Sequence, residues 1–266
     1  MGSESTAEIF ITMLPTLRTS VEPLPFSILA ELKTQDILQS CIIPAPMNNS
    51  SFDLVIFDCD GVLVESEELA CQLYVQMFAE YGYKLDFDET LHKFYGTTLH
   101  ERVKTTSQEI GRTPPDDFIP MFYQRQAELT EQALQAVPYV HELIESLSIP
   151  ICVASNGSRN EINLRLRVTK LLPYFEGAIF SGIEVPRPKP APDVYLAAAK
   201  HFNIQPSRCV VVEDSVLGVT AAVAAEMKVY GHATFNSAEK LQAAGAIPFK
   251  SMLELKEILA REFSAV

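Results

Sequence analysis

Residues 52–66 read FDLVIFDCDGVLVES, the segment with the most informative pattern in the chain. Its four apolar residues from Leu54 to Phe57 run without polar alternation, which is typical of a strand buried on both faces of a parallel sheet. Asp58 is the first polar residue after this run, and Asp60 follows two positions later. Because ligands of open α/β sheets bind at the carboxyl ends of the strands, both aspartates are candidate catalytic residues.

The close spacing of the two acids has a physical consequence. Gly61 permits a tight turn that brings both carboxylates to one spot. There they repel each other unless a cation or a shared proton relieves the charge. The pair therefore indicates either a divalent metal or one ionised and one protonated acid, and the plain alternative is a loop with two solvated aspartates.

The composition is that of a globular protein. Of the 266 residues, 47% are hydrophobic and 21% are charged, and the net charge is −13. No Lys/Arg-rich run is present, which argues against nucleic acid as a partner. No stretch of about 18 apolar residues exists, so we expect no membrane span. The five cysteines form no CxxC pair, which favours a reducing compartment, and we expect a cytoplasmic monomer.

The chain divides into three parts by pattern. Residues 1–50 carry five prolines and are expected to be a poorly ordered extension, with a short helix near 27–40 and an alternative start at Met47. Residues 66–137 have a helical pattern throughout, and strands alternate with helices after Pro138. This predicts an α/β fold, a doubly wound, Rossmann-like parallel sheet. We expect a core of 51–65 and 138–266 with an all-helical cap, 66–137, inserted after the first strand.

Two later segments carry groups suited to phosphate. The apolar run from Ile149 ends in Ser155-Asn156-Gly157, and a proline-rich loop carries Lys189. We expect Ser155 and the following backbone N–H groups to open a helix, where phosphate is favoured. The ammonium of Lys189 adds a positive charge that draws phosphate in despite the acidic surface.

A second pair of acids follows the apolar run 209–212. Glu213 and Asp214 would meet Asp58 at the sheet edge and form an anionic group suited to Mg²⁺, which prefers oxygen ligands. Asp58, once ionised beside the metal, can attack phosphorus and form an aspartyl-phosphate. Asp60 can protonate the leaving alkoxide and then take a proton from water.

Four segments together resemble the haloacid dehalogenase superfamily, in its sugar-phosphatase and β-phosphoglucomutase branch. They are DCDGVLVES at 58–66, VASNG at 153–157, KPAPD at 189–193 and VEDSVLGV at 212–219. The resemblance begins near residue 53 and is greatest to bacterial phosphatases of the 6-phosphogluconate type. It implies that 66–137 are a C1 cap that selects the substrate. It also implies roles for single residues: nucleophile Asp58, general acid/base Asp60, phosphoryl-binding Ser155, Asn156 and Lys189, and Mg²⁺ held by Asp58, Glu213, Asp214 and the backbone carbonyl of Asp60.

Rival functions remain open on this fold. A dehalogenase resembles this chain but lacks an acid two residues after its nucleophile, so Asp60 argues against it. Mutases of the family carry a cap arginine where this chain has Leu99, although Arg102 lies one turn later. A non-catalytic binding protein is the third possibility. We expect a Mg²⁺-dependent phosphatase acting on a small phosphorylated metabolite, a sugar phosphate or phosphogluconate-like compound. The five histidines show no ligand spacing and are expected at the surface or at helix ends.

Overall fold

The computed structural model describes residues 52–95 and 97–264. A six-stranded sheet in the order β3-β2-β1-β4-β5-β6 forms the centre, and every neighbouring pair of strands is parallel. The strands are β1 (Leu54–Phe57), β2 (Ile151–Ser155), β3 (Ile179–Ser181), β4 (Cys209–Glu213), β5 (Lys228–His232) and β6 (Ile247–Phe249). Because all strands point the same way, the residues after β1, β2 and β4 meet at one edge of the sheet, as the sequence predicted.

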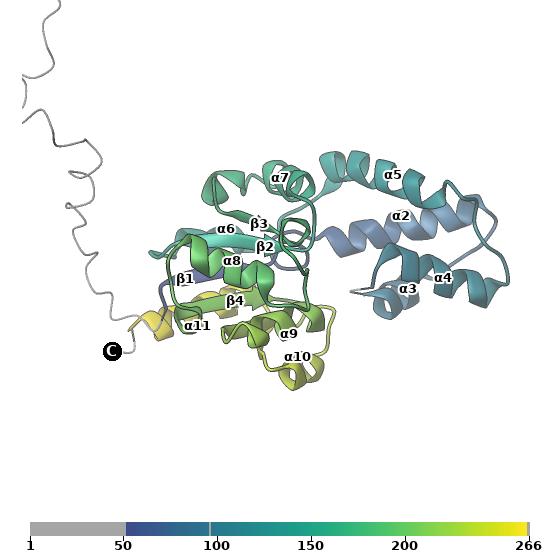
Figure 1. Ribbon diagram of the computed structural model, residues 1–266. Coiled ribbons are helices and arrows are strands. Elements are labelled where there is room, and N and C mark those ends of the chain that lie inside the picture. Colours follow the sequence, from purple (N-terminus) through teal and green to yellow (C-terminus); the bar gives the residue numbers. More distant parts are fainter. Residues whose placement is uncertain (1–51, 96, 265–266) are drawn as a thin grey trace, which may run out of the picture. The chain divides into compact units, whose positions relative to one another are not determined.

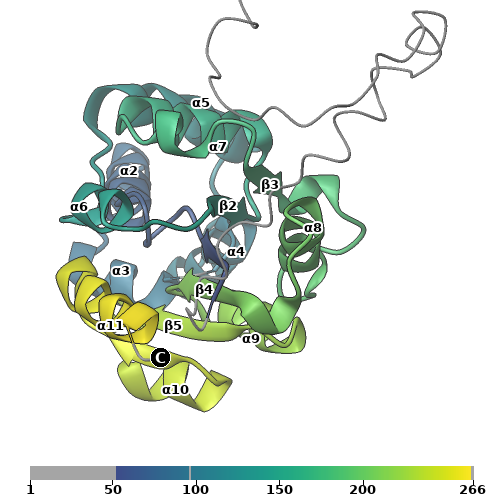
Figure 2. The same cartoon turned by 90° about the vertical axis from the view of Figure 1, so that its left-hand side faces the viewer.

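Helices cover both faces of the sheet (Figure 2). The first face packs against α6 (Val140–Glu145), α7 (Arg159–Val168) and α11 (Met252–Ser264), and the second against α8 (Asp193–His201), α9 (Val216–Ala224) and α10 (Ala238–Ala244). Within β1, Val55 and Phe57 join the first core, whereas Leu54 and Ile56 join the second. Both faces of β1 are therefore buried, which explains the uninterrupted apolar run.

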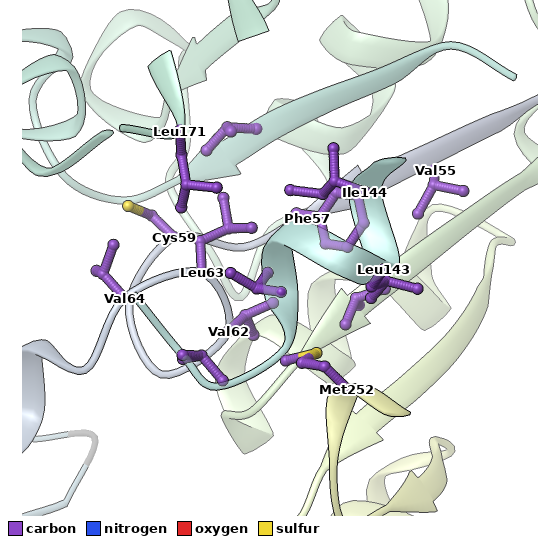
Figure 3. Packing of buried hydrophobic residues seen from close by; sticks show 14 of the residues in the cluster. Val55, Phe57, Cys59, Val62, Leu63, Val64, Leu143, Ile144, Leu171 and Met252 are labelled. Atoms are coloured by element: carbon purple, nitrogen blue, oxygen red, sulfur yellow. The ribbon is translucent and has the colours of Figure 1, made fainter. Parts of the chain in front are cut away.

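The first core continues past β1 into the turn that carries the two aspartates. Val62 and Leu63 are fully buried beside Leu143 and Met252 (Figure 3). The turn closes through hydrogen bonds from the Leu63 and Val64 N–H groups to the Cys59 carbonyl oxygen, at 2.9 and 3.1 Å. Apolar packing thus fixes the backbone that presents the candidate catalytic residues.

Four helices lie between β1 and β2 in the sequence: α2 (Ser66–Glu80), α3 (Phe87–Phe94), α4 (Leu99–Ile110) and α5 (Phe118–Ala133). They gather beyond one end of the sheet (Figure 1) and have an aromatic core of their own, in which Tyr74 and Phe78 contact Phe118 and Phe122. Their two connections to the sheet pair with each other, since the Glu65 N–H donates to the Gln135 carbonyl and the Val137 N–H to the Leu63 carbonyl, both at 3.0 Å. The structure thus has the predicted helical insertion, and the domain boundaries at 65/66 and 137/138 stay a prediction.

Most expected elements are present, with three differences. The sequence analysis did not predict β6 or α10. β6 has only three residues and contains Pro248, and proline within a sheet is confined to edge strands. Within the helical pattern of 66–137, the last helix begins at Phe118, after Pro114 and Pro115. Three short 3₁₀ helices were not expected: Leu172–Phe175, Gly182–Glu184 and Pro206–Arg208.

Two other predictions concern membranes and the N-terminal segment. In the part of the chain that the structure describes, no helix is long and apolar enough to cross a membrane. The extension 1–50 and its short helix at 27–40 lie outside the described residues. Cys152 and Cys209 are fully buried in the second core, as small core residues should be.

Candidate active site

The centre of the site is an ion-paired group of three buried side chains from three different segments. The Lys189 Nζ donates to Asp58 Oδ1 at 2.5 Å and to Glu213 Oε1 at 2.7 Å. Asp58 follows β1, Glu213 ends β4, and Lys189 comes from the loop before α8. The structure therefore brings together residues that lie 131 and 24 positions from Lys189 in the sequence.

Glu213 has the most hydrogen bonds of this group. Its Oε1 also accepts from the Tyr195 hydroxyl, and its Oε2 accepts from the Asp214 N–H, the Ser215 N–H and the Ser215 hydroxyl, each at 2.9 Å. Burial acts to raise the pKa of Glu213, but Lys189 and the Ser215 donors hold it below its usual range. Glu213 is thus an ionised anchor that fixes both Lys189 and the turn after β4.

Asp214 has a different environment. Its Oδ2 accepts a hydrogen bond from the hydroxyl of Tyr95, which follows α3, and the Tyr95 ring stacks on Phe235 at 4.9 Å. The Asn236 side chain donates to the Asp214 backbone carbonyl at 2.8 Å. No cation among the described residues pairs with Asp214, and burial together with the charges of Glu213 and Asp58 raises its pKa well above the usual value.

The Asp60 side chain is held by two other side chains. Its Oδ1 accepts from the Ser66 hydroxyl at the start of α2, and its Oδ2 accepts from Arg165 Nη1 in α7 at 3.1 Å. Arg165 is largely buried, and burial acts to lower its pKa, but Asp60 and its other acidic neighbours hold that pKa above the usual range. The guanidinium therefore stays charged and orients the Asp60 side chain, a contact that no local pattern in the sequence predicts.

The loop after β2 corrects one expectation. The segment Ser155-Asn156-Gly157 precedes the helix rather than opening it, because α7 begins at Arg159 with a capping box of Ser158 and Glu161. The Gly157 N–H donates to Ser155 Oγ at 3.1 Å and is already used. The Ser155 hydroxyl and the Asn156 N–H are the groups of this loop left to meet a ligand.

The Asn156 side chain has a structural task. Its Oδ1 accepts from the Lys189 N–H at 2.9 Å, and its Nδ2 donates to the Lys189 carbonyl oxygen at 3.2 Å. These two bonds hold the backbone of Lys189, so the amide places the ammonium group between Asp58 and Glu213. Asn156 thus supports Lys189 through its side chain.

The donor set fits a divalent cation. One oxygen each of Asp58, Glu213 and Asp214 lies within 4.8 Å of the other two, and all three residues are buried. Lys189 supplies one positive charge for three carboxylates. Burial, together with the negative charges of Glu213 and Asp60, raises the pKa of Asp58 despite the lysine. A hard cation with oxygen ligands would relieve this excess and let all three acids ionise.

A cavity of about 230 Å³ opens above these residues. The sheet edge contributes Asp58, Asp60, Ser155 to Gly157, Lys189, Glu213 to Ser215 and Leu217, and the helical insertion contributes Glu67, Tyr95, Thr97 and Thr98. The insertion residues could not be chosen from the sequence, because only the packing of α2 to α4 brings them to the cavity.

One histidine was misjudged. His232 is 5% exposed at the end of β5, and its Nδ1 donates to the Gly61 carbonyl oxygen at 2.9 Å. Its ring stacks on Phe249 at 5.0 Å. It was expected at the surface or at a helix end because the histidines show no ligand spacing, and the sequence does not reveal its partner 171 residues away.

Residues 55–232 match the family model of the haloacid dehalogenase-like hydrolases. This chain belongs to that family. The match includes the candidate residues that follow β1, β2 and β4, and also Lys189. The resemblance read from the four segments is therefore confirmed, as is the assignment to hydrolases of the haloacid dehalogenase type.

Individual relatives agree with this. The 6-phosphogluconate phosphatase of Escherichia coli K12 is 35% identical over 182 residues, which are 68% of this chain and 82% of that protein. The phosphorylated carbohydrates phosphatase of Thermotoga maritima is 30% identical over 226 residues, 78% of this chain and 100% of that protein. A crystal structure of a family hydrolase from Deinococcus radiodurans R1, with bound phosphate and sodium, is 33% identical with a TM-score of 0.73 and covers 80% of this chain and 97% of that chain.

Proposed function

We propose that this protein is a Mg²⁺-dependent phosphatase that hydrolyses a small phosphorylated sugar or related metabolite through an aspartyl-phosphate. The observation that carries the proposal is the Asp58 carboxylate, which lines the cavity beside Lys189, Glu213 and Asp214. The two phosphatases named among the relatives act, by their names, on phosphorylated carbohydrates or a sugar acid phosphate. A cytoplasmic, monomeric protein stays a prediction.

The first half of the reaction transfers the phosphoryl group to Asp58. A carboxylate oxygen of Asp58 forms a bond to phosphorus while the bond from phosphorus to the alcohol oxygen of the substrate breaks. Asp60 gives its proton to that alkoxide, and the alcohol leaves. The Lys189 ammonium and the Ser155 hydroxyl stabilise negative charge on the transferring oxygens, a contribution of the kind that preorganised donors make.

The second half regenerates the enzyme. Asp60, now ionised, takes a proton from a water molecule, whose oxygen forms a bond to phosphorus as the bond from phosphorus to Asp58 breaks. Inorganic phosphate leaves and Asp60 is protonated again. Asp58, Glu213, Asp214 and the Asp60 backbone carbonyl would hold Mg²⁺. When bound, that ion offsets the charge between the nucleophile and the phosphoryl oxygens.

The alternative mutase reaction requires a cation that grips a second phosphate. Arg102, the only candidate raised by the sequence, donates through Nη2 to Glu67 at 2.8 Å and through Nε to the Thr97 carbonyl at 3.2 Å. It is 8% exposed and does not line the cavity. This arrangement favours hydrolysis over phosphoryl return.

The test is release of phosphate from p-nitrophenyl phosphate with Mg²⁺ and with EDTA. D58N should abolish turnover with the fold retained, because the amide is not a nucleophile. D60N should slow turnover by about 10²–10⁴-fold. D53N serves as the matched control, since Asp53 precedes the same strand and lies outside the cavity. Normal turnover by D58N, or full activity in EDTA, would contradict the proposal.

A further inference from the structure

The charged residues that line the cavity are acids, with one exception. Among the described residues that line it, Lys189 is the one cation, and its ammonium is bound to Asp58 and Glu213. If the phosphoryl group occupies this end, as the proposed function requires, the leaving group faces the residues of the insertion. No described arginine, lysine or histidine side chain lines that end.

Glu67 is the charged residue that the insertion presents to the cavity. Its side chain is 22% exposed, whereas that of its partner Arg102 is 9% exposed. The guanidinium is held from two sides, by Glu67 and by the Thr97 carbonyl. The Glu67 carboxylate therefore faces the cavity. Arg102, which could have bound an anion, instead orients that carboxylate.

The remaining groups on that side are neutral and suited to hydroxyls. The hydroxyls of Tyr95, Thr97 and Thr98 already donate to Asp214, the Phe94 carbonyl and Glu101, so they present lone pairs that can accept from an alcohol. From the sheet edge, Leu217, which is 48% exposed, adds an apolar surface. The Glu67 carboxylate accepts hydrogen bonds from alcohol groups, and because it already neutralises Arg102, the acid-rich lining that the structure describes offers no free cation to a second anion. The lining is matched to a polyol rather than to an acid.

We infer that the leaving group of the substrate is a neutral, hydroxyl-rich alcohol, and that Glu67, by occupying Arg102, disfavours substrates with a second phosphate or a carboxylate. This inference rests on the proposed function and narrows it. It separates this chain from the E. coli relative, whose name gives a sugar acid phosphate as its substrate.

The test compares two substrates that differ in one group. Sorbitol 6-phosphate and 6-phosphogluconate are open six-carbon phosphate monoesters, with a hydroxymethyl group in one where the other has a carboxylate. We expect kcat/KM of the unmodified protein to favour sorbitol 6-phosphate by about tenfold or more, the scale set by juxtaposed like charges. This ratio needs no variant, so it is measurable even if a substitution at Glu67 impairs folding.

E67Q should narrow the ratio by about fivefold or more, since it leaves the charge of Arg102 without its carboxylate partner and available to the anion. E68Q removes the same charge from the neighbouring residue, which is exposed and outside this cavity, and should leave the ratio unchanged. Preference of the unmodified protein for 6-phosphogluconate, or equal shifts in E67Q and E68Q, would overturn the inference. Activity on p-nitrophenyl phosphate reports the proposed function separately, because failure there removes the phosphatase itself.

Discussion

Replacing Gly61 by alanine tests the packing of the turn most directly. Gly61 has φ +71°, and a Cβ there would lie 2.7 Å from both the Asp214 Cγ and the Tyr95 hydroxyl, and closer still to an Asp214 oxygen. The substitution thus combines a left-handed backbone with a collision at the predicted metal site. Gly111 ends α4 with φ +69°, and nothing lies within 4 Å of its Cβ position. G111A therefore isolates the backbone contribution.

The expected magnitudes follow from these two geometries. G111A should lower the free energy of unfolding by about 1–2 kcal/mol, the cost of a left-handed L-residue. G61A adds the cost of displacing packed neighbours, about 1–3 kcal/mol more. Because Asp214 must move, G61A should also lose about 10²-fold in kcat/KM, the effect of a displacement near 1 Å.

Urea denaturation gives the two stabilities, and hydrolysis of p-nitrophenyl phosphate at fixed Mg²⁺ gives the two rates. G111A should keep the rate of the unmodified protein. If G61A is no less stable than G111A and turns over normally, then the contact between the turn and Asp214 does not constrain the site, and the reasoning fails.

Two further predictions concern stability. Burial lowers the pKa of His232 in the folded protein. A free histidine titrates at about 6.5, so below that pH the unfolded chain binds more protons than the folded one. Stability is therefore lost as the pH falls from there toward the folded-state pKa. The difference in unfolding free energy between the unmodified protein and H232Q should therefore shrink between pH 7.5 and 5.5, and a constant difference would contradict this. D53N breaks the paired hydrogen bonds to Arg208, both at 2.8 Å, and should cost about 0.5–1 kcal/mol at 0.15 M salt, since both side chains are 39% exposed; no change in the urea midpoint would refute it.

The sequence predicted most of the sheet because its central strands are buried on both faces. Leu54 to Phe57 alternate between two cores, and this is the arrangement that leaves an uninterrupted apolar run. The polar residues at the strand ends were found for the same reason, since Asp58 and Glu213 each end such a run. Periodicity failed at β6, where an edge position allows a proline and a short strand.

The contacts around the candidate residues were beyond sequence reasoning. Arg165 meets Asp60 across 105 positions, and Tyr95 meets Asp214 across 119. Glu67 is one of several acids near the start of α2, and only its pairing with Arg102 distinguishes it. Such pairs depend on how the helices pack against the sheet edge and against each other, and no local spacing encodes that.

The paired connections at Leu63–Glu65 and Gln135–Val137 have an evolutionary consequence. The polypeptide leaves the sheet and returns to it at a single place, and the four intervening helices bring their own aromatic interior. Mutation can therefore change the four-helix insertion, even in its length, while the strands of the sheet keep their register. Selection for new metabolites would then act on the part of the cavity that the helices line, while Asp58, Lys189 and Glu213 keep their places at the sheet edge.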